Sequence, residues 1–176
     1  MTGSDVLKNA IRNIHNFPKE GVIYRDITPI LKDPSLMKLA VDCVAESARK
    51  YKFDVIAGPE SRGFIFGVPL ALRLGVGFIP IRKAGKLPFD TYSKSYSLEY
   101  GEATIEVHKD AVSPDTRVLV VDDLLATGGT SRATIELFHE IGATPIASIF
   151  LIELEALGGR SALESLGTGI ESIIKY

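Results

Sequence analysis

Short apolar runs that alternate with helical patterns constrain the fold of this chain more than any other feature. The runs are continuous and lack the polar residue at every second position that marks a half-exposed strand, so they are typical of strands covered on both faces. Helical spacing between them, at about 64–74 and 131–141, predicts an α/β fold with a mostly parallel twisted sheet flanked by helices. The runs occupy residues 53–58, 77–81, 118–121 and 145–151.

The N-terminal region is expected to hold two further helices. The first spans about residues 4–13, with Ser4 as its N-cap. The second begins after Asp33, which caps it, and has Pro34 in the first turn, where a missing N–H costs nothing. Cys43 falls on the apolar stripe of this second helix, so packing explains it.

Residues 82–109 break the alternation of strands and helices. A polar loop containing Gly and Pro is followed by two segments of period 2, joined at Gly101-Glu102. A loop this long inside one domain is usually functional, because ordering it costs conformational entropy. We therefore expect a long flexible lid loop over about 82–100, with a β-ribbon at its base.

Length and composition indicate one domain that covers residues 1–176. With 20 Lys and Arg against 22 Asp and Glu, the net charge of −2 offers no global positive field for nucleic acid or a membrane surface. The single cysteine cannot form an intramolecular disulfide, and the first residues lack the apolar core of a secretion signal. A cytoplasmic setting is expected.

The segment VLVVDDLLATGGT, residues 118–130, carries the strongest functional signal. A buried strand delivers Asp122 and Asp123 to the carboxyl end of the sheet, where open α/β folds bind ligands. The next turn opens a helix, so unpaired N–H groups, the helix dipole, two glycines and two threonine hydroxyls suit a monophosphate. Because the paired acids need hydroxyl donors or Mg²⁺, the implied ligand is a ribose 5-phosphate. The turn residues are Ala126, Thr127, Gly128, Gly129 and Thr130.

Other interpretations of these motifs fit less well. A turn with solvated acids would not need two acids, two threonines and two glycines in this order. No Lys follows Gly129, which excludes a Walker A loop, and the acids precede the glycines, opposite to a dinucleotide fingerprint. Pro59 stands where a nucleophile elbow around Ser61 would need glycine.

The chain resembles the type I phosphoribosyltransferases, and VVDDLLATGGT is similar to the form of this signature in the adenine phosphoribosyltransferases. Further segments, at 17–34, 60–67, 81–88 and 95–101, are similar to that family's blocks in order and spacing. The resemblance implies a Rossmann-like fold with a small hood, built from about 1–34 and the C-terminal segment. It also implies transfer of a phosphoribosyl group from phosphoribosyl pyrophosphate to N9 of adenine, giving AMP and pyrophosphate in purine salvage. Mg²⁺ held mainly through the substrate, with Asp122 and Asp123 as candidate ligands, and a homodimer are implied as well.

The resemblance also implies roles for individual residues. Arg62 and Glu99 are the candidate catalytic residues, with Glu99 near the base and the bond being formed. The purine pocket matches Ile23, Tyr24, Arg25 and Leu154, with Tyr24 stacking on one face of the base and Leu154 packing on the other. The pyrophosphate-binding residues are Glu60, Ser61, Arg62, Gly63, Arg82, Lys83, Lys86 and Tyr100.

Each role has an ordinary alternative. A strand-to-helix turn with Ser61 and the planar guanidinium of Arg62 suits phosphate oxygens, but an exposed arginine in a turn is the plainer interpretation. The cations at 82, 83 and 86 would also be explained by a solvated face, and Tyr24 by a half-buried aromatic.

Two rival functions remain open at this point. A phosphoribosyltransferase for another base would keep the phosphate turns and change residues 23–25. A non-catalytic sensor of phosphoribosyl pyrophosphate that controls transcription would need a DNA-binding element or a basic face. The negative net charge and the length of the domain favour the enzyme.

Overall fold

The computed structural model describes residues 2–98 and 101–176, and its main element is a seven-stranded sheet in the order β5-β6-β4-β3-β7-β8-β9. The strands β4, β3, β7, β8 and β9 run parallel, whereas β6 is antiparallel to both β4 and β5. The predicted mostly parallel sheet is confirmed. Its strands are β3 (Val55–Pro59), β4 (Gly77–Lys83), β5 (Thr91–Leu98), β6 (Gly101–His108), β7 (Arg117–Leu125), β8 (Thr144–Glu153) and β9 (Gly169–Lys175).

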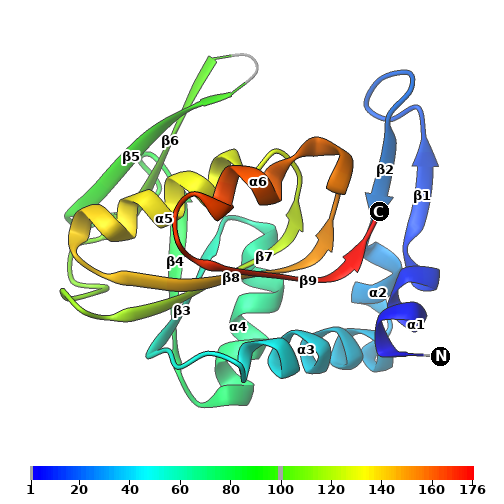
Figure 1. Cartoon of the computed structure of the whole chain (residues 1–176), viewed down its shortest axis with the longest axis horizontal. Helices are drawn as coiled ribbons and strands as arrows, with labels where there is room; N and C mark the ends of the chain where they lie inside the picture. The colour runs from blue at the N-terminus through cyan, green and yellow to red at the C-terminus, as the bar shows by residue number, and fades with distance from the viewer. Residues whose placement is uncertain (1, 99–100) are drawn as a thin grey trace.

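Helices cover both faces of this sheet (Figure 1). Neighbouring residues of one strand therefore pack on opposite sides: Ile56 lies in the cluster with α3 and α4, and Ala57 in the cluster with α5. This arrangement is why the strands read as continuous apolar runs. The helices are α3 (Pro34–Ala48), α4 (Arg62–Leu74), α5 (Gly129–Ile141) and α6 (Gly159–Glu164), with a short 3-10 helix η1 (Glu155–Leu157) before α6.

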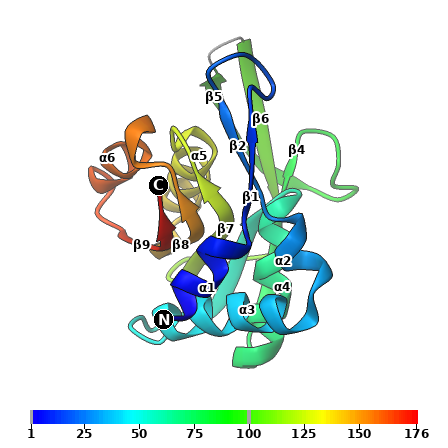
Figure 2. The same cartoon turned by 90° about the vertical axis from the view of Figure 1, so that its right-hand side faces the viewer.

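The N-terminal elements lie together at one end of the molecule, on the right in Figure 1 and toward the viewer in Figure 2. They are joined to the C-terminal segment, because the Arg25 guanidinium lies 3.8 Å from the ring centroid of Tyr176 and Lys8 donates a hydrogen bond to the carbonyl of Lys175. The elements are α1 (Gly3–Ala10), β1 (Arg12–His15), β2 (Ile23–Asp26) and α2 (Thr28–Lys32), and β1 and β2 form a separate two-stranded sheet.

The predicted first helix was wrong at both ends. A capping box makes Thr2, not Ser4, the N-cap: its hydroxyl accepts from the amide of Asp5, and the Asp5 carboxylate accepts from the amide of Thr2. The helix ends at Ala10 because Asn13 pairs with Arg25 in the β1–β2 ladder.

Two other expectations concern residues 33–48 and 82–100. Asp33 caps α3 as expected, accepting from the amides of Ser35 and Leu36. The expected β-ribbon is confirmed as the antiparallel pair β5–β6, but its first strand already begins at Thr91, within the expected lid. The loop between β4 and β5 is therefore shorter than predicted, because the backbone of its second half forms hydrogen bonds in a β-ladder.

In the part of the chain that the structure describes, no helix is long and apolar enough to cross a membrane.

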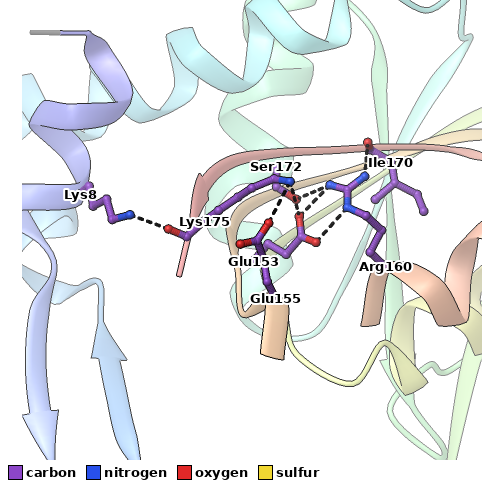
Figure 3. Close-up of polar contacts among 7 residues, drawn as sticks. All are labelled: Lys8, Glu153, Glu155, Arg160, Ile170, Ser172 and Lys175. Atoms are coloured by element: carbon purple, nitrogen blue, oxygen red, sulfur yellow. Dashed lines mark hydrogen bonds and ion pairs between the residues drawn. The ribbon is translucent and has the colours of Figure 1, made fainter. Parts of the chain in front are cut away.

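A buried ion pair holds the carboxyl end of β8 (Figure 3). The Glu153 carboxylate accepts from Arg160 at 2.9 and 2.7 Å, and Arg160 also donates to the carbonyl of Ile170 on β9. The hydrogen bonds from Arg160 keep the pKa of Glu153 below its ordinary value. This pair joins α6, β8 and β9 next to Leu154.

Replacing Arg160 with Met is expected to reduce the free energy of unfolding by about 3 kcal/mol, because the buried carboxylate loses both hydrogen bonds from Arg160 and keeps only Lys175 Nζ at 3.9 Å. Arg117→Met is the matched control, since Arg117 forms an equally forked pair with Asp54 at the surface. The Glu153 side chain is 3% exposed and that of Asp54 is 46% exposed. The control is expected to cost less than about 1 kcal/mol. Urea denaturation measures both, and equal losses would contradict the role of burial.

Candidate active site

A cavity of about 940 Å³ opens at the carboxyl ends of β3 and β7. After β3 the chain continues through α4 to β4, which is the neighbour of β3 on one side. After β7 it continues through α5 to β8, which is the neighbour of β7 on the opposite side. Ligands of open α/β sheets bind at such a switch point. Of the residues proposed from the sequence, the cavity is lined by Tyr24, Glu60, Ser61, Arg62, Lys83, Asp122, Asp123, Ala126, Thr127, Gly128, Gly129 and Thr130.

The turn between β7 and α5 is built for close backbone approach. Gly128 caps α5 with a φ of +84°, which favours glycine, and a Cβ there would lie 3.0 Å from the carbonyl oxygen of Gly159. A Cβ on Gly159 would lie 2.3 Å from the carbonyl oxygen of Ala126. The first amides of α5 have no partner within the helix and face the cavity. The turn that precedes them packs on its other side against the start of α6.

Asp122 and Asp123 form a pair of neighbouring carboxyl groups at the end of β7, with Asp123 2% exposed and Asp122 half-buried. Burial raises the pKa of Asp122 well above its ordinary value, and the charge of Asp123 adds to the rise. Burial also raises the pKa of Asp123, although Arg62 opposes this, with its Nε 3.2 Å from Asp123 Oδ2. One arginine thus offsets only part of the cost of burying two carboxylates, so the pair favours hydroxyl donors or a cation.

The turn between β3 and α4 contributes the opposite wall. Glu60 accepts from Arg82 Nε at 2.8 Å and from the amide of Lys83 at 3.1 Å. Burial alone would raise the pKa of Glu60, but these hydrogen bonds together lower it by more, so the pKa of Glu60 lies below its ordinary value. A Cβ on Gly63 would lie 2.9 Å from the carbonyl oxygen of Val121, so α4 approaches β7 closely.

Tyr24 connects this wall to the N-terminal elements. Its hydroxyl accepts from Arg62 Nη1 at 3.4 Å, and its ring packs edge-on against Phe17 with the centroids 5.3 Å apart. Arg62 therefore contacts both Tyr24 and Asp123, two cavity-lining residues that lie far apart in the sequence.

Several residues proposed from the sequence do not line the cavity in the described part of the chain: Ile23, Arg25, Gly63, Arg82, Lys86 and Leu154. Arg82 reaches it only through Glu60, and its Nη1 donates to the carbonyl of Lys86. Leu154 packs against the main core. Glu99 and Tyr100 lie outside the described residues.

Sequence reasoning missed two serines that line the cavity. Ser131, in the first turn of α5, is 3% exposed, and Ser97 comes from β5. The position of Ser131 directly after the glycine-rich turn could have indicated it, but Ser97 reaches the cavity only through the fold.

No group of three or more His, Cys, Asp or Glu side chains is placed to hold a metal ion among residues 2–98 and 101–176.

Comparisons with known proteins define the class of this fold and site. A family model described as the phosphoribosyl transferase domain matches residues 28–165, and the chain belongs to that family. Within it, the chain belongs with the adenine phosphoribosyltransferases, which are pentosyltransferases.

Three relatives document this membership. An adenine phosphoribosyltransferase of Francisella philomiragia is 52% identical, over 98% of each chain. The crystal structure of one from Thermoanaerobacter pseudethanolicus is 50% identical, with a TM-score of 0.93 over 98% of this chain and 99% of that one. One from Saccharomyces cerevisiae, complexed with D-2,5-dideoxy-2,5-imino-altritol 1,6-bisphosphate and adenine, is 39% identical, with a TM-score of 0.90 over 97% and 98% of the two chains.

Asp122→Asn is expected to raise the Tm of the free protein at pH 7. Because folding raises the pKa of Asp122, this residue binds more of a proton in the folded chain than in the unfolded chain above the ordinary aspartate pKa of about 4. Stability contributed by this residue is therefore lost as the pH rises through that window. Asparagine removes the charge and can still accept from the amide of Asp123.

Thermal unfolding followed by circular dichroism between pH 4 and pH 8 measures this effect. The exposed Asp110→Asn is the control and should leave the pH dependence unchanged. A lower Tm for Asp122→Asn at pH 7 would show that the buried charge is fully compensated in the free protein.

Proposed function

We propose that this chain transfers the 5-phosphoribosyl group of phosphoribosyl pyrophosphate to N9 of adenine, forming AMP and releasing pyrophosphate in purine salvage. One observation carries the proposal: at the switch point, a helix N-terminus rich in backbone donors adjoins a buried carboxylate pair and an arginine. The membership of the chain among the adenine phosphoribosyltransferases supports adenine as the base.

The turn 126–130 would bind the 5-phosphate through backbone amides and the hydroxyls of Thr127 and Thr130. Asp122 and Asp123 would accept hydrogen bonds from the ribose hydroxyls. Their raised pKa values support this, because a buried carboxylate gains most from partners that donate. The sugar would thus be held at both ends by one strand-turn-helix unit.

The opposite wall would bind the pyrophosphate. Ser61 and the first amides of α4 would donate to its oxygens, and Arg62 would bind it with a planar fork. Lys83 lines the same cavity and would add a point charge. Glu60 would act indirectly by orienting Arg82. The complete proposed set is Glu60, Ser61, Arg62, Gly63, Arg82, Lys83, Lys86 and Tyr100.

Mg²⁺ is the proposed cofactor, held mainly by substrate oxygens. Asp122 and Asp123 fit this role, because carboxylate oxygens are the ligands this hard cation prefers and a cation would relieve their mutual repulsion. When bound, Mg²⁺ would neutralise charge on the pyrophosphate.

Adenine would stack on Tyr24 with Leu154 on its other face, while main-chain groups of Ile23 and Arg25 read its edge. A site whose polar groups stay unpaired with the wrong base rejects that base far more strongly than apolar walls do. The location of Tyr24 on the cavity wall, in contact with Arg62, supports this placement.

The bond from ribose C1 to the pyrophosphate oxygen breaks as the bond from C1 to adenine N9 forms, with inversion at C1 through an oxocarbenium-like transition state. Holding the fragments in line and stabilising the departing oxygen supply most of the acceleration. Arg62 would stabilise that oxygen. Glu99 would act near the base, either by transferring a proton or by stabilising the charge that develops there. Closure of the loop between β4 and β5, residues 84–90, would exclude water, which would otherwise hydrolyse the substrate.

The proposal extends to a single-domain enzyme, with the N-terminal elements as a hood, that forms a homodimer in the cytoplasm. Val68 and Leu72 support a dimer, because these apolar side chains are 40% and 81% exposed and lie one turn apart on α4. The single free cysteine, Cys43, is compatible with a reducing compartment.

AMP formation from adenine and phosphoribosyl pyrophosphate tests the activity. We expect AMP with adenine, far less nucleotide product with hypoxanthine or guanine, and loss of turnover when Mg²⁺ is chelated. Chromatographic separation of the nucleotides measures all three. Preference for hypoxanthine or guanine would assign the chain to another base, and no product with any base would contradict the proposed reaction.

Asp123→Asn and Arg62→Ala are each expected to lower kcat/KM by about 10- to 100-fold, because a hydrogen bond to a charged group is worth about 1.5–3 kcal/mol. The control is Arg73→Ala, which removes an arginine from the far end of α4, where it pairs with Asp42. Steady-state kinetics with unchanged circular dichroism spectra give the comparison. Wild-type kcat/KM in both site variants would remove the two residues from the reaction.

A further inference from the structure

The first strand of the β5–β6 hairpin lies against the N-terminal end of α5. The Tyr96 hydroxyl is 3.0 Å from Thr130 Oγ1, and its ring lies 3.7 Å from the position of a Cβ on Gly129. Thr130 lines the cavity. A strand far from the phosphate turn in sequence thus contacts a hydroxyl of that turn directly.

We propose that Tyr96 is a positioning residue that orients the Thr130 hydroxyl toward the 5-phosphate. The inference rests on the proposed function, in which Thr130 donates to that phosphate. It identifies a residue that touches no substrate atom and acts on phosphoribosyl pyrophosphate through its neighbour.

The direction of the hydrogen bonds follows from counting protons. Either hydroxyl can donate in the free protein. A phosphate oxygen can only accept, so Thr130 must donate its single proton to the phosphate when the ligand binds. The lone pairs of Thr130 Oγ1 then accept from Tyr96, and a chain of two bonds runs from tyrosine to threonine to phosphate. Each bond in such a chain polarises and strengthens the next.

A second contact on the same strand separates positioning from simple attachment of the hairpin. Lys94 Nζ forms ion pairs with Glu140 and Glu136 further along α5. These residues do not line the cavity among the described residues. Loss of Lys94 therefore weakens the attachment of β5 to α5 and leaves Thr130 untouched.

The experiment compares Tyr96→Phe with Lys94→Met, using ribose 5-phosphate as the probe in calorimetry and phosphoribosyl pyrophosphate in kinetics. Tyr96→Phe keeps the ring and removes the hydroxyl. We expect it to weaken ribose 5-phosphate binding and raise the KM for phosphoribosyl pyrophosphate by about 3- to 10-fold, with the KM for adenine unchanged. Lys94→Met should leave both values within about twofold.

A double-mutant cycle with Thr130→Val completes the test. Tyr96→Phe should have no further effect once Thr130 has lost its hydroxyl, because the two groups act in series. Additive losses would overturn the proposal, as would equal losses in Tyr96→Phe and Lys94→Met.

The same cycle distinguishes failure of this inference from failure of the proposed function. If Thr130→Val weakens ribose 5-phosphate binding and Tyr96→Phe does not, the phosphate site stands and the role of Tyr96 is overturned. If Thr130→Val binds ribose 5-phosphate like the wild type, Thr130 does not donate to the phosphate and the role of Tyr96 is overturned, whereas the proposed reaction is overturned only if the wild type forms no AMP.

Discussion

The parallel pairing of β3 with β7 is the constraint on which the rest of the molecule depends. Val55, Ile56 and Ala57 pair with Val118, Leu119 and Val120, so both strands end at the same edge of the sheet. The helices that follow them depart to opposite faces. Two turns with exposed amides are thereby brought to one cavity, and neither turn alone would hold both the 5-phosphate and the pyrophosphate of the proposed substrate.

The electrostatics of this cavity are incomplete in the free chain. The two acids Asp122 and Asp123 share one arginine partner, which pairs with Asp123, and Arg82 pairs with Glu60. Arg62 contacts Asp123 on one side and Tyr24 on the other. The pairs keep the cations and acids in place before a substrate arrives, so less reorganisation accompanies the reaction.

The sequence predicted what depends on local pattern. The buried strands were found because their runs are continuous, and α3 because Asp33 and Pro34 mark its start. The turn between β7 and α5 was expected at the carboxyl end of the sheet because its glycines and acids stand in one short segment, and it lines the cavity there. Strands β1 and β9 were not predicted: Arg12–His15 is largely exposed, and Gly169–Lys175 is only half-buried at the edge of the sheet. Neither carries a continuous apolar run.

What the sequence could not predict depends on contacts between distant segments. Ser97 reaches the cavity, and Tyr96 reaches Thr130, only because β5 folds back along α5. The engagement of Arg25 with the Tyr176 ring joins residues from the two ends of the chain. No local spacing encodes such contacts, whereas the resemblance to a family supplied candidate roles without their geometry.

Gly128 and Gly159 face each other across the back of the phosphate turn, so the floor of the cavity is made of main chain on both sides. Any side chain at either glycine would collide with this main chain, so these two positions tolerate little change. The walls near Tyr24 are made of side chains and can change freely by comparison. Such a division would allow the specificity for the base to change during evolution while the proposed phosphate-binding turn kept its shape.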